Sequence, residues 1–445
     1  MNNEAICAIA TPPGTSALGV IRVSGFNIVE IISPIFSTKL KDRAAIVANI
    51  YDGSEFIDNV ISIYYKSPRS YTGEDVIEII CHGNQIILNS IIQLLNKHGV
   101  RTAEPGEFTK RAFFNNKLSL VQAEAVADLI SASNKKALIA ANNSLNGKFL
   151  NEINSICGDI LTIRSEVESI INFPEDDDVP ILNQTRILKN IVSILSKLES
   201  LIDNSEQGMA LNIRPSYAVV GKPNSGKSSF INHLLRTDAS IVTSKKGTTR
   251  DSITYELTVD DIVINIIDTA GIHATDDEIE KEGISRSLKS ASSSDNIIYL
   301  VDDTVGLSPE DKAFIDDNNF SNYTIVFNKI DLTKNSPKID LGNPKSVYVS
   351  AKTGAGMNLI REVIKDSYQS DNTSENIFLA RNRHLEHLRD GQAYLINSKR
   401  LVSEGAFDLL AEELRLSHLA ISAIIGQNPT EDLLTEIFAS FCIGK

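Results

Sequence analysis

Cysteine is scarce in this sequence, and tryptophan is absent from it. The four cysteines, Cys7, Cys81, Cys157 and Cys442, lie far apart and form no C-x-x-C pair. This spacing argues against a disulfide framework and against a zinc site. A reducing compartment fits best, so we expect a cytoplasmic protein.

Long apolar runs are also missing. No stretch of about 18 or more uncharged apolar residues occurs, so we expect no transmembrane helix and no membrane partner. The first residues, MNNEAICAIATPPG, contain no basic segment followed by an apolar run. We therefore expect no secretory signal peptide at this end.

Positive charge is in deficit. Lys and Arg number 43 against 57 Asp and Glu, which gives a formal net charge of −14. A general coat for nucleic acid requires clustered cations, so that function is not expected and we predict no DNA partner. A local basic patch is compatible with this composition. The length of 445 residues, with 42% hydrophobic and 22% charged residues, predicts two to four ordinary globular domains.

The apolar pattern changes along the chain and predicts a multidomain protein with α/β and all-α parts. Residues 1–117 contain short β-branched runs between turn clusters, which indicates a mixed α/β domain. Residues 118–212 and 369–445 have helical spacing. Between them, 213–368 alternates apolar strands with helices, the pattern of a mainly parallel sheet covered on both faces. We expect this α/β domain to be inserted into a discontinuous helical domain.

Individual elements can be placed within these parts. Strands are expected near 5–10, 20–23, 60–64 and 76–80, and a helix at 85–96. Ser119 followed by Gln122 is a capping-box pattern that predicts the start of a helix. Apolar residues between 187 and 202 recur at a helical period.

Residues 221–228, GKPNSGKS, fit the phosphate-binding pattern G-x-x-x-x-G-K-[ST]. The pattern follows the apolar strand YAVVG and precedes a predicted helix, the context in which backbone N–H groups and the helix N-terminus hold phosphates. Lys227 would pair with the β- and γ-phosphates, and the hydroxyl of Ser228 would bind Mg²⁺. A chance glycine turn is the alternative, which the flanking strand and helix disfavour.

Three later motifs follow in order, each after an apolar strand. They are Asp268-Thr269-Ala270-Gly271, Asn328-Lys329-Ile330-Asp331 and Ser350-Ala351-Lys352. Asp268 can reach Mg²⁺ through water, and Gly271 can sense the γ-phosphate. A carboxylate at Asp331 can accept hydrogen bonds from N1–H and the 2-amino group of guanine, which predicts GTP over ATP. The set resembles the translation-factor-related GTPases, within a Ras-like P-loop domain.

The segment TSKKGTTRD predicts a loop that closes over the nucleotide, with Thr249 over Mg²⁺; a plain flexible loop is the alternative. Ile272 stands where Ras-type enzymes have a water-orienting glutamine, so another residue must orient the water. The predicted GTP-binding residues are Asn224, Ser225, Gly226, Lys227, Ser228, Ser229, Thr243, Ser244, Lys245, Lys246, Gly247, Thr248, Thr249, Asp268, Thr269, Ala270, Gly271, Asn328, Lys329, Asp331, Ser350, Ala351 and Lys352.

Segments outside the nucleotide motifs give a more specific resemblance. They are ATPPG, VIRVSG, SYTGEDVIEIICHG, PGEFTKRAF, NKLSLVQAEAVADLI, NFPEDDD and the terminal FCIGK. With them, the chain resembles the MnmE (TrmE) family of tRNA wobble-uridine modification GTPases over essentially its whole length.

The resemblance implies a fold and an activity. The N-terminal domain would bind a folate-type one-carbon donor, the 5,10-methylene form of tetrahydrofolate, and mediate homodimerisation. With an MnmG-type flavoprotein, in a heterotetramer whose FAD lies on the partner only, the protein would add an aminomethyl or carboxymethylaminomethyl group to C5 of the wobble uridine (U34) of certain tRNAs. K⁺-dependent dimerisation of the GTPase domains would activate GTP hydrolysis.

The resemblance also implies roles for particular residues. Folate would be bound by Arg22, Glu78, Lys117 and Lys445. Mg²⁺ would be bound by Ser228 and Thr249, and K⁺ by the side chains of Asn224 and Thr248 with the carbonyls of Thr243 and Lys245. Glu280 would orient the attacking water, and Cys442 would serve the modification chemistry. For the charged residues the alternative is a solvated surface position, and for Cys442 it is a buried, inert thiol.

The chain departs from the family pattern at Thr15-Ser16-Ala17, at Asn84 and at His273. Two other functions share the nucleotide motifs: a ribosome-assembly GTPase switch without modification chemistry, and a GTP-binding scaffold that has lost one activity. Folate binding by residues 1–117 would discriminate the first of these from the modification enzyme.

Overall fold

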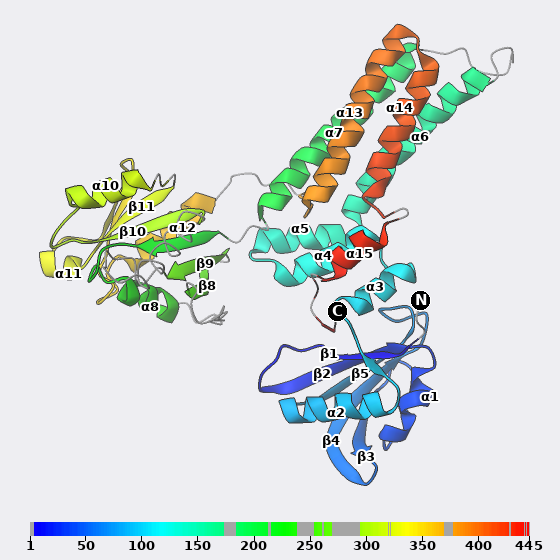
Figure 1. Cartoon of the computed structure of the whole chain (residues 1–445), viewed down its shortest axis with the longest axis horizontal. Coiled ribbons are helices and arrows are strands. Elements are labelled where there is room, and N and C mark those ends of the chain that lie inside the picture. Colours follow the sequence, from blue (N-terminus) through cyan, green and yellow to red (C-terminus); the bar gives the residue numbers. More distant parts are fainter. Residues whose placement is uncertain are drawn as a thin grey trace, which may run out of the picture. The chain divides into compact units, whose positions relative to one another are not determined.

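A computed structural model describes the chain over residues 4–172, 184–211, 215–237, 253–259, 262–268, 294–318, 320, 322–368, 377–426, 429–439, 441 and 443–444. The chain divides into two compact units, which are described separately (Figure 1). One unit contains Met1–Ser131, Ala140–Gln207 and Asn376–Lys445, and the other contains Ala132–Ile139 and Gly208–Glu375.

The first unit begins with a six-stranded sheet in the order β3-β4-β5-β2-β1-β6. Only the β1–β6 pairing is parallel; the other four are antiparallel. The strands are β1 (Ile6–Ile9), β2 (Ser16–Gly25), β3 (Ala45–Asp52), β4 (Glu55–Tyr65), β5 (Asp75–Gly83) and β6 (Arg101–Thr102). The four predicted strands are confirmed, and β3 is an edge strand that the sequence analysis missed.

Helix α2 (Gln85–Lys97) confirms the predicted helix and packs on this sheet through buried side chains such as Leu88, Ile91 and Leu95. Asn84 caps it: the side-chain Oδ1 accepts a hydrogen bond from the N–H of Ile86 at 2.8 Å. Asparagine is a favoured N-cap residue. The departure at Asn84 therefore has a local structural role. A short helix α1 (Ile28–Ile32) and a 3₁₀ turn (Ser33–Ile35) cover the same core.

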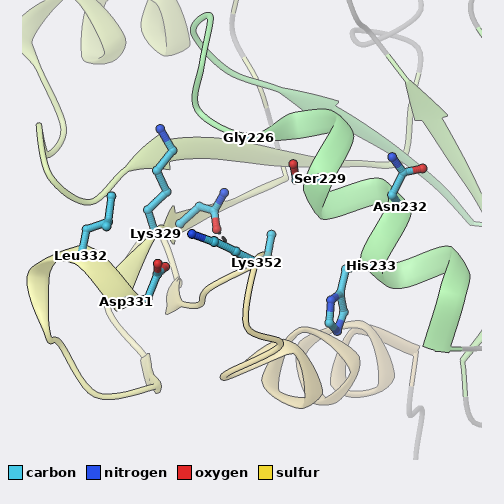
Figure 2. A pocket seen from close by; sticks show the side chains of 10 residues that line it. Gly226, Ser229, Asn232, His233, Lys329, Asp331, Leu332 and Lys352 are labelled. Atoms are coloured by element: carbon cyan, nitrogen blue, oxygen red, sulfur yellow. Dashed lines mark hydrogen bonds between the residues drawn. The ribbon is translucent and has the colours of Figure 1, made fainter.

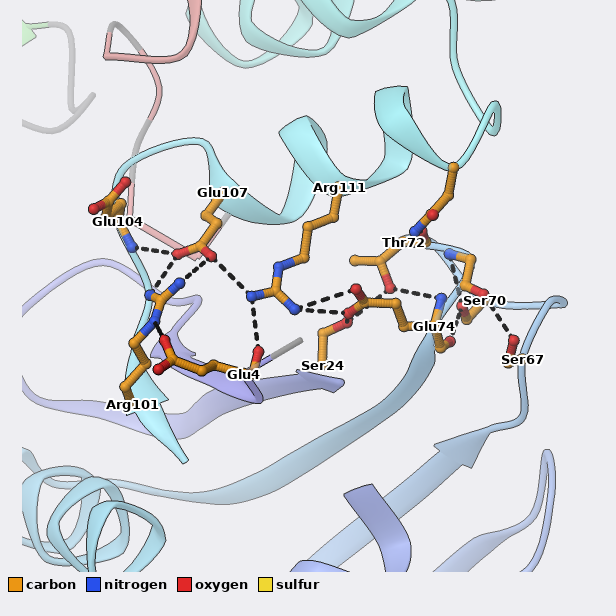
Figure 3. A network of polar contacts seen from close by, with 12 residues as sticks. Glu4, Ser24, Ser67, Ser70, Thr72, Glu74, Arg101, Glu104, Glu107 and Arg111 are labelled. Carbon is orange, nitrogen blue, oxygen red and sulfur yellow. Dashed lines mark hydrogen bonds and ion pairs between the residues drawn. The ribbon is translucent and has the colours of Figure 1, made fainter. Parts of the chain in front are cut away.

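A buried ionic network attaches α3 (Glu107–Phe114) to the sheet (Figure 3). Arg111 donates hydrogen bonds to both carboxylate oxygens of Glu74, at 3.0 and 3.2 Å, and to Glu107 at 2.9 Å. Arg101 donates to both carboxylate oxygens of Glu107, at 2.6 and 2.8 Å. Burial alone would raise the pKa of Glu107, but the two arginines and a backbone N–H outweigh it and lower that pKa to about 2.

The rest of the first unit is helical, as predicted. Its helices are α4 (Leu120–Ser131), α5 (Lys135–Leu145, whose first turn belongs to the second unit), α6 (Lys148–Asn172), α7 (Gln184–Leu211), α13 (Asn382–Glu404), α14 (Phe407–Ala423) and α15 (Glu431–Ala439). The capping box is confirmed, because Ser119 and Gln122 exchange hydrogen bonds of 3.0 and 3.2 Å. The apolar stripe is confirmed by Ile187, Ile191 and Leu198, which are all buried.

Helices from before and after the inserted segment meet at a buried charge cluster, which we call the Glu124 cluster. Its members are Glu124, Arg381, Arg383 and His384. Glu124 is 1% exposed and accepts from Arg383 at 2.9 and 3.0 Å, with His384 Nε2 at 2.8 Å. Arg381 donates to the backbone carbonyl of Glu124 at 3.5 Å. The cluster thus joins α4 to the start of α13.

The second unit is built on a seven-stranded sheet in the order β12-β13-β11-β10-β7-β9-β8. The four inner pairings are parallel, and β8 and β12 are antiparallel edges, so the predicted mainly parallel sheet is confirmed. The strands are β7 (Ser216–Val220), β8 (Ile253–Val259), β9 (Ile262–Asp268), β10 (Asn296–Asp302), β11 (Tyr323–Asn328), β12 (Lys338–Asp340) and β13 (Ser346–Tyr348).

Apolar residues cover both faces of this sheet because successive strand residues point to opposite sides. Val219 of β7 shares a core with Phe230 of α8 (Lys227–Thr237) and Ile360 of α12 (Met357–Tyr368). The next residue, Val220, belongs to a separate core with Ile315 of α10 (Pro309–Asp317). The short helix α11 (Ile330–Thr333) follows β11. Buried packing on both sides fixes the strand ends, where the polar motifs lie.

Candidate nucleotide-binding site

A pocket of about 440 Å³ lies in the second unit, beside the ends of β11 and β13 and the start of α8. Ligands of parallel sheets bind at the carboxyl ends of the strands. The pocket is lined by Gly226, Ser229, Asn232, His233, Asn328, Lys329, Asp331, Leu332, Ala351 and Lys352. Figure 2 shows the α8 side chains on one side of it and Lys329, Asp331 and Leu332 on the other. Three of the four sequence motifs therefore contribute to one cavity.

The phosphate-binding loop runs from the end of β7 to the start of α8, as predicted. Asn224 has a positive φ of 62°, and Gly226 has a φ of 96°. A Cβ atom on Gly226 would lie 2.4 Å from Nδ2 of Asn328, so only glycine fits there. Ser225 is 2% exposed, and its Oγ makes no hydrogen bond within the described part of the chain. The loop is thus held tightly against the base-binding motif.

Lys227 turns back into this loop. Its Nζ donates to the carbonyl oxygens of Gly221 at 2.7 Å and Lys222 at 3.1 Å. Burial lowers the pKa of Lys227, and the carboxylate of Asp268 acts in the opposite direction. Asp268 ends β9, directly opposite Val219 of β7. The ammonium group and this carboxylate therefore flank the loop that would hold the phosphates.

Asn328 connects the phosphate-binding loop to the motif Ser350-Ala351-Lys352. Its Nδ2 donates to the carbonyl of Ser225 at 2.8 Å, and its Oδ1 accepts from the N–H of Ala351 at 2.9 Å. Asp331 accepts at Oδ1 from the hydroxyl of Ser350 at 2.6 Å. Lys329 pairs with Asp302 at 2.6 Å. Asn328, Lys329 and Asp331 are thereby each held in place by a neighbouring residue.

Two pocket residues on α8 and one on α11 were missed by the sequence analysis: Asn232, His233 and Leu332. The sequence spacing does indicate Asn232 and His233. They follow Ser229 by three and four residues, so a helix places all three on one face. His233 packs against Gly354, where a Cβ atom would lie 2.8 Å from the imidazole Cε1.

Part of the predicted site lies outside the described residues. This holds for Thr243, Ser244, Lys245, Lys246, Gly247, Thr248, Thr249, Thr269, Ala270, Gly271, His273, Glu280, Cys442 and Lys445. Of the remaining predicted residues, Ser228 is exposed in the first turn of α8, and Lys352 lines the pocket.

The predicted folate-binding residues lie in the first unit. Arg22 of β2 donates two hydrogen bonds to Oε1 of Glu78 on β5, at 2.8 and 3.1 Å. It donates a third, at 3.2 Å, to the carbonyl of Gly444. Glu78 and Lys117 both line a second cavity of about 470 Å³. The structure thus brings three of the four positions together and places the residue before Lys445 beside Arg22.

The three cysteines within the described residues are free and buried. Burial raises the pKa of Cys7 to about 12 and the pKa values of Cys81 and Cys157 to about 11. These thiols are poor nucleophiles at neutral pH. Over the ranges that the structure describes, no group of three or more His, Cys, Asp or Glu side chains could hold a metal ion. No described helix is long and apolar enough to span a bilayer.

The parallel sheet, the glycine-bounded loop with Lys227 and the Asn328–Asp331 motif define a P-loop nucleotide-binding protein of the GTPase class. Residues 5–117 match the family of the GTP-binding protein TrmE N-terminus, and residues 120–442 match the MnmE helical domain. The chain therefore belongs to the MnmE family of tRNA modification GTPases, which confirms the resemblance and, with it, the prediction of a GTP hydrolase in tRNA modification.

Individual relatives extend over the whole chain. It is 40% identical over 455 residues to the tRNA modification GTPase MnmE of Legionella pneumophila subsp. pneumophila strain Philadelphia 1, which covers 100% of each chain. It is 39% identical over 452 residues to the tRNA modification GTPase MnmE of Francisella tularensis subsp. holarctica strain LVS, which covers 99% of each. Among solved structures it is similar to a point variant of Aquifex aeolicus Era bound to GDP·AlF4⁻, at 24% identity and a TM-score of 0.28 over 41% of this chain and 66% of that one.

Proposed function

We propose that this chain is a K⁺-activated GTP hydrolase that installs the aminomethyl or carboxymethylaminomethyl group at C5 of wobble uridine in certain tRNAs, together with an MnmG-type flavoprotein that carries FAD. One observation carries the proposal. The chain is similar over its full length to tRNA modification GTPases, and it contains both a guanine-type pocket in one unit and a second cavity around Glu78 in the other.

The nucleotide pocket assigns roles to its residues. Asp331, oriented by Ser350, would accept from N1–H and the 2-amino group of guanine. Backbone N–H groups of the loop and Lys227 would hold the phosphates. When bound, Mg²⁺ and K⁺ would supply positive charge to the phosphoryl oxygens. Ser228 and Thr249 would hold the first ion, and Asn224, Thr243, Lys245 and Thr248 the second; Glu280 would orient the water.

The cavity beside Glu78 suits a reduced folate in size and chemistry. About 470 Å³ lies in the range of small-molecule pockets. Arg22 occupies only Oε1 of Glu78. Oε2 accepts one long hydrogen bond, at 3.5 Å, from the hydroxyl of Tyr65, and its second lone pair can accept from the N–H edge of a pterin. Lys117 offers a cation to a glutamate carboxylate. The folate would be the 5,10-methylene form of tetrahydrofolate, and Lys445 would complete its site.

We propose that the chain has four functional segments: a folate-binding and dimerisation domain at 1–117, helical parts at 118–212 and 369–445, and the GTPase domain at 213–368. Hydrolysis in the inserted domain would change the arrangement of the helical parts, and with them the C-terminal segment that carries Cys442. Gly444, two residues further on, accepts a hydrogen bond from Arg22, which pairs with Glu78 in the lining of the second cavity.

Mass spectrometry of tRNA nucleosides tests the proposal. Cells that lack their own family member would receive this gene, or its Cys442→Ser version, together with the partner flavoprotein gene from the same source. Return of the C5-modified wobble uridine with the wild type, and not with the variant, supports both the modification activity and the role of Cys442. A soluble wild-type protein that hydrolyses GTP and restores no modified uridine would instead favour the ribosome-assembly switch or the scaffold.

A further inference from the structure

The cavity beside Glu78 carries more positive charge than folate recognition by Arg22, Glu78 and Lys117 explains. Its lining includes two further arginines, Arg43 and Arg69. Counting Arg22 and Asp42, which pair with lining residues, four cations and two carboxylates surround the cavity. This is a local excess of two positive charges in a chain whose net charge is −14.

The side chains of Arg43 and Lys117 both donate hydrogen bonds to one short loop, and their acceptors are the carbonyls of two consecutive residues. Lys117 Nζ donates to the carbonyl of Pro68 at 3.1 Å, and Arg43 donates to the carbonyl of Arg69. Neither cation has a carboxylate partner among the residues that the structure describes. Two like charges are therefore held on adjacent carbonyls without a counter-charge, which favours binding of an anion.

Arg43 is fixed in place by more than this hydrogen bond. Its backbone adopts a left-handed conformation with φ of 56°, and its N–H donates to the carbonyl of Tyr64 at 2.7 Å. Its guanidinium lies over the ring of Tyr65, 5.8 Å from the centroid. A guanidinium has five N–H donors, so those not used on Arg69 can serve a carboxylate in two-point fashion.

Arg69 differs from these two cations, because it is largely exposed and has a carboxylate partner. Its side chain is 72% exposed, and its pairing with Asp42 is loose at 3.4 Å. An exposed pair of this kind contributes little, so Asp42 is readily displaced by a ligand carboxylate.

We propose that Arg43 and Lys117 bind the first two carboxylates of a folate's glutamate tail, and that Arg69 binds the third, which only a γ-linked second glutamate supplies. The inference rests on the proposed folate function and specifies the substrate class: folates that carry more than one glutamate. The charges match, because a single glutamate brings two carboxylates to the two unpaired cations. Each γ-linked glutamate turns one carboxylate into an amide and brings two, so it adds one negative charge.

Isothermal titration calorimetry on the full chain tests this. The ligands are 5-formyltetrahydrofolate with one glutamate and with three. We expect wild type to bind the triglutamate about two- to fivefold more tightly, the range of one exposed charge pair. Arg69→Gln should abolish this preference, so that the two folates bind equally, and Arg43→Gln should weaken both about tenfold. Lys97→Gln, which removes an exposed cation that pairs with Asp52, should change neither.

The outcomes separate the two levels of the proposal. Equal affinities for the two folates in wild type, or a triglutamate preference that survives Arg69→Gln, overturns the subsite while leaving folate binding in place. Failure of wild type to bind either folate removes the folate function itself. Circular dichroism and GTP binding check that Arg43→Gln folds. Raising the salt concentration should reduce the triglutamate preference, because exposed charges are screened.

Discussion

The side chain of Asn328 donates a 2.8 Å hydrogen bond to the backbone carbonyl of Ser225, and so ties the end of one strand to the loop after another. The same side chain accepts from Ala351 at 2.9 Å. One buried amide thus sets the spacing between the phosphate end and the base end of the pocket.

Asn328→Ala should therefore weaken nucleotide binding without removing any group that touches the phosphates. It leaves a carbonyl and an N–H without partners, each worth about 1–3 kcal/mol, so we expect affinity for fluorescent GDP to fall roughly 10- to 100-fold. Equilibrium titration measures this. Asn335→Ala, which alters an exposed asparagine paired with Asp303, is the control. An unchanged affinity would mean that the loops hold their spacing without Asn328.

Asp331→Asn should change which purine is bound. The new side chain can still accept from Ser350, but its amino group opposes N1–H and the 2-amino group of guanine. We expect GTP affinity to drop on the order of 10²–10⁴-fold. Xanthosine triphosphate, which has an oxygen at position 2, should bind the variant better than wild type. Competition against fluorescent GDP reads both effects, and a variant that retains GTP preference contradicts the assignment.

Glu280→Ala should abolish turnover and leave GTP binding intact, because a water-orienting carboxylate acts on the reaction and not on the nucleotide. A loss of about 10²–10⁴-fold in kcat is the size expected. Phosphate release is measured in K⁺ and in Na⁺, with Glu278→Ala as the neighbouring control. K⁺ should accelerate wild type and the control. Loss of nucleotide binding in the Glu280 variant would show that this residue has another role.

The Glu124 cluster should make the helical part sensitive to acid. Burial alone would raise the pKa of Glu124, but the hydrogen bond with His384 and the charges of Arg383 and Arg381 outweigh it and lower that pKa to about 2. Burial lowers the pKa of His384, so its imidazole is neutral at pH 7 and contributes the hydrogen bond rather than a charge. A lowered folded-state pKa gives stability that is complete above the unfolded value, near 4.5, and is lost as pH falls toward 2.

Glu124→Gln should then cost about 3–5 kcal/mol at pH 7, since it removes the carboxylate that pairs with the largely buried Arg383, while Arg381 keeps its pair with Asp128. Hydrogen exchange in α4 and α13 measures the loss. The difference from wild type should shrink as pH falls from about 5 toward 2. Glu412→Gln, which removes an exposed carboxylate paired with Arg415, should have little effect at any pH. A difference that does not depend on pH would assign the cost to packing.

Arg111→Met should destabilise the N-terminal sheet domain by about 3–5 kcal/mol, because it leaves the buried carboxylate of Glu74 without a cation, while Glu107 keeps Arg101. Denaturant unfolding followed by far-ultraviolet circular dichroism suits a chain without tryptophan. Adding Glu74→Gln to Arg111→Met should restore part of the stability. Lys97→Gln, which removes the cation of an exposed ion pair, serves as the control. Simple additivity of the two changes would argue against a coupled network.

Local patterns predicted most of the fold and the described half of the nucleotide site. The phosphate-binding loop and the motif at Asn328 depend on a few consecutive residues at strand ends, so their spacing alone indicates them. The sequence pattern did not predict the edge strand β3, because its residues alternate between buried and exposed over only part of its length.

Interactions between distant residues could not be predicted in the same way. Arg111 meets Glu74 across 37 residues, and nothing in the segment PGEFTKRAF by itself indicates a buried partner. His233 lines the pocket because α8 turns it toward Gly354, which a motif search does not reveal. Arg43 and Arg69 join Glu78 in one cavity only through the order of strands β4, β5 and the loops beside them.

The Glu124 cluster can form only late in the synthesis of the chain. Glu124 is translated 260 residues before its partner His384. At about 5–20 residues per second, that interval is roughly 13–52 seconds. During this interval the chain contains Glu124, but its partners Arg381, Arg383 and His384 have not yet been synthesised. The nucleotide-binding unit emerges in between and can complete its sheet first, so the helical domain is the last part of this protein to close.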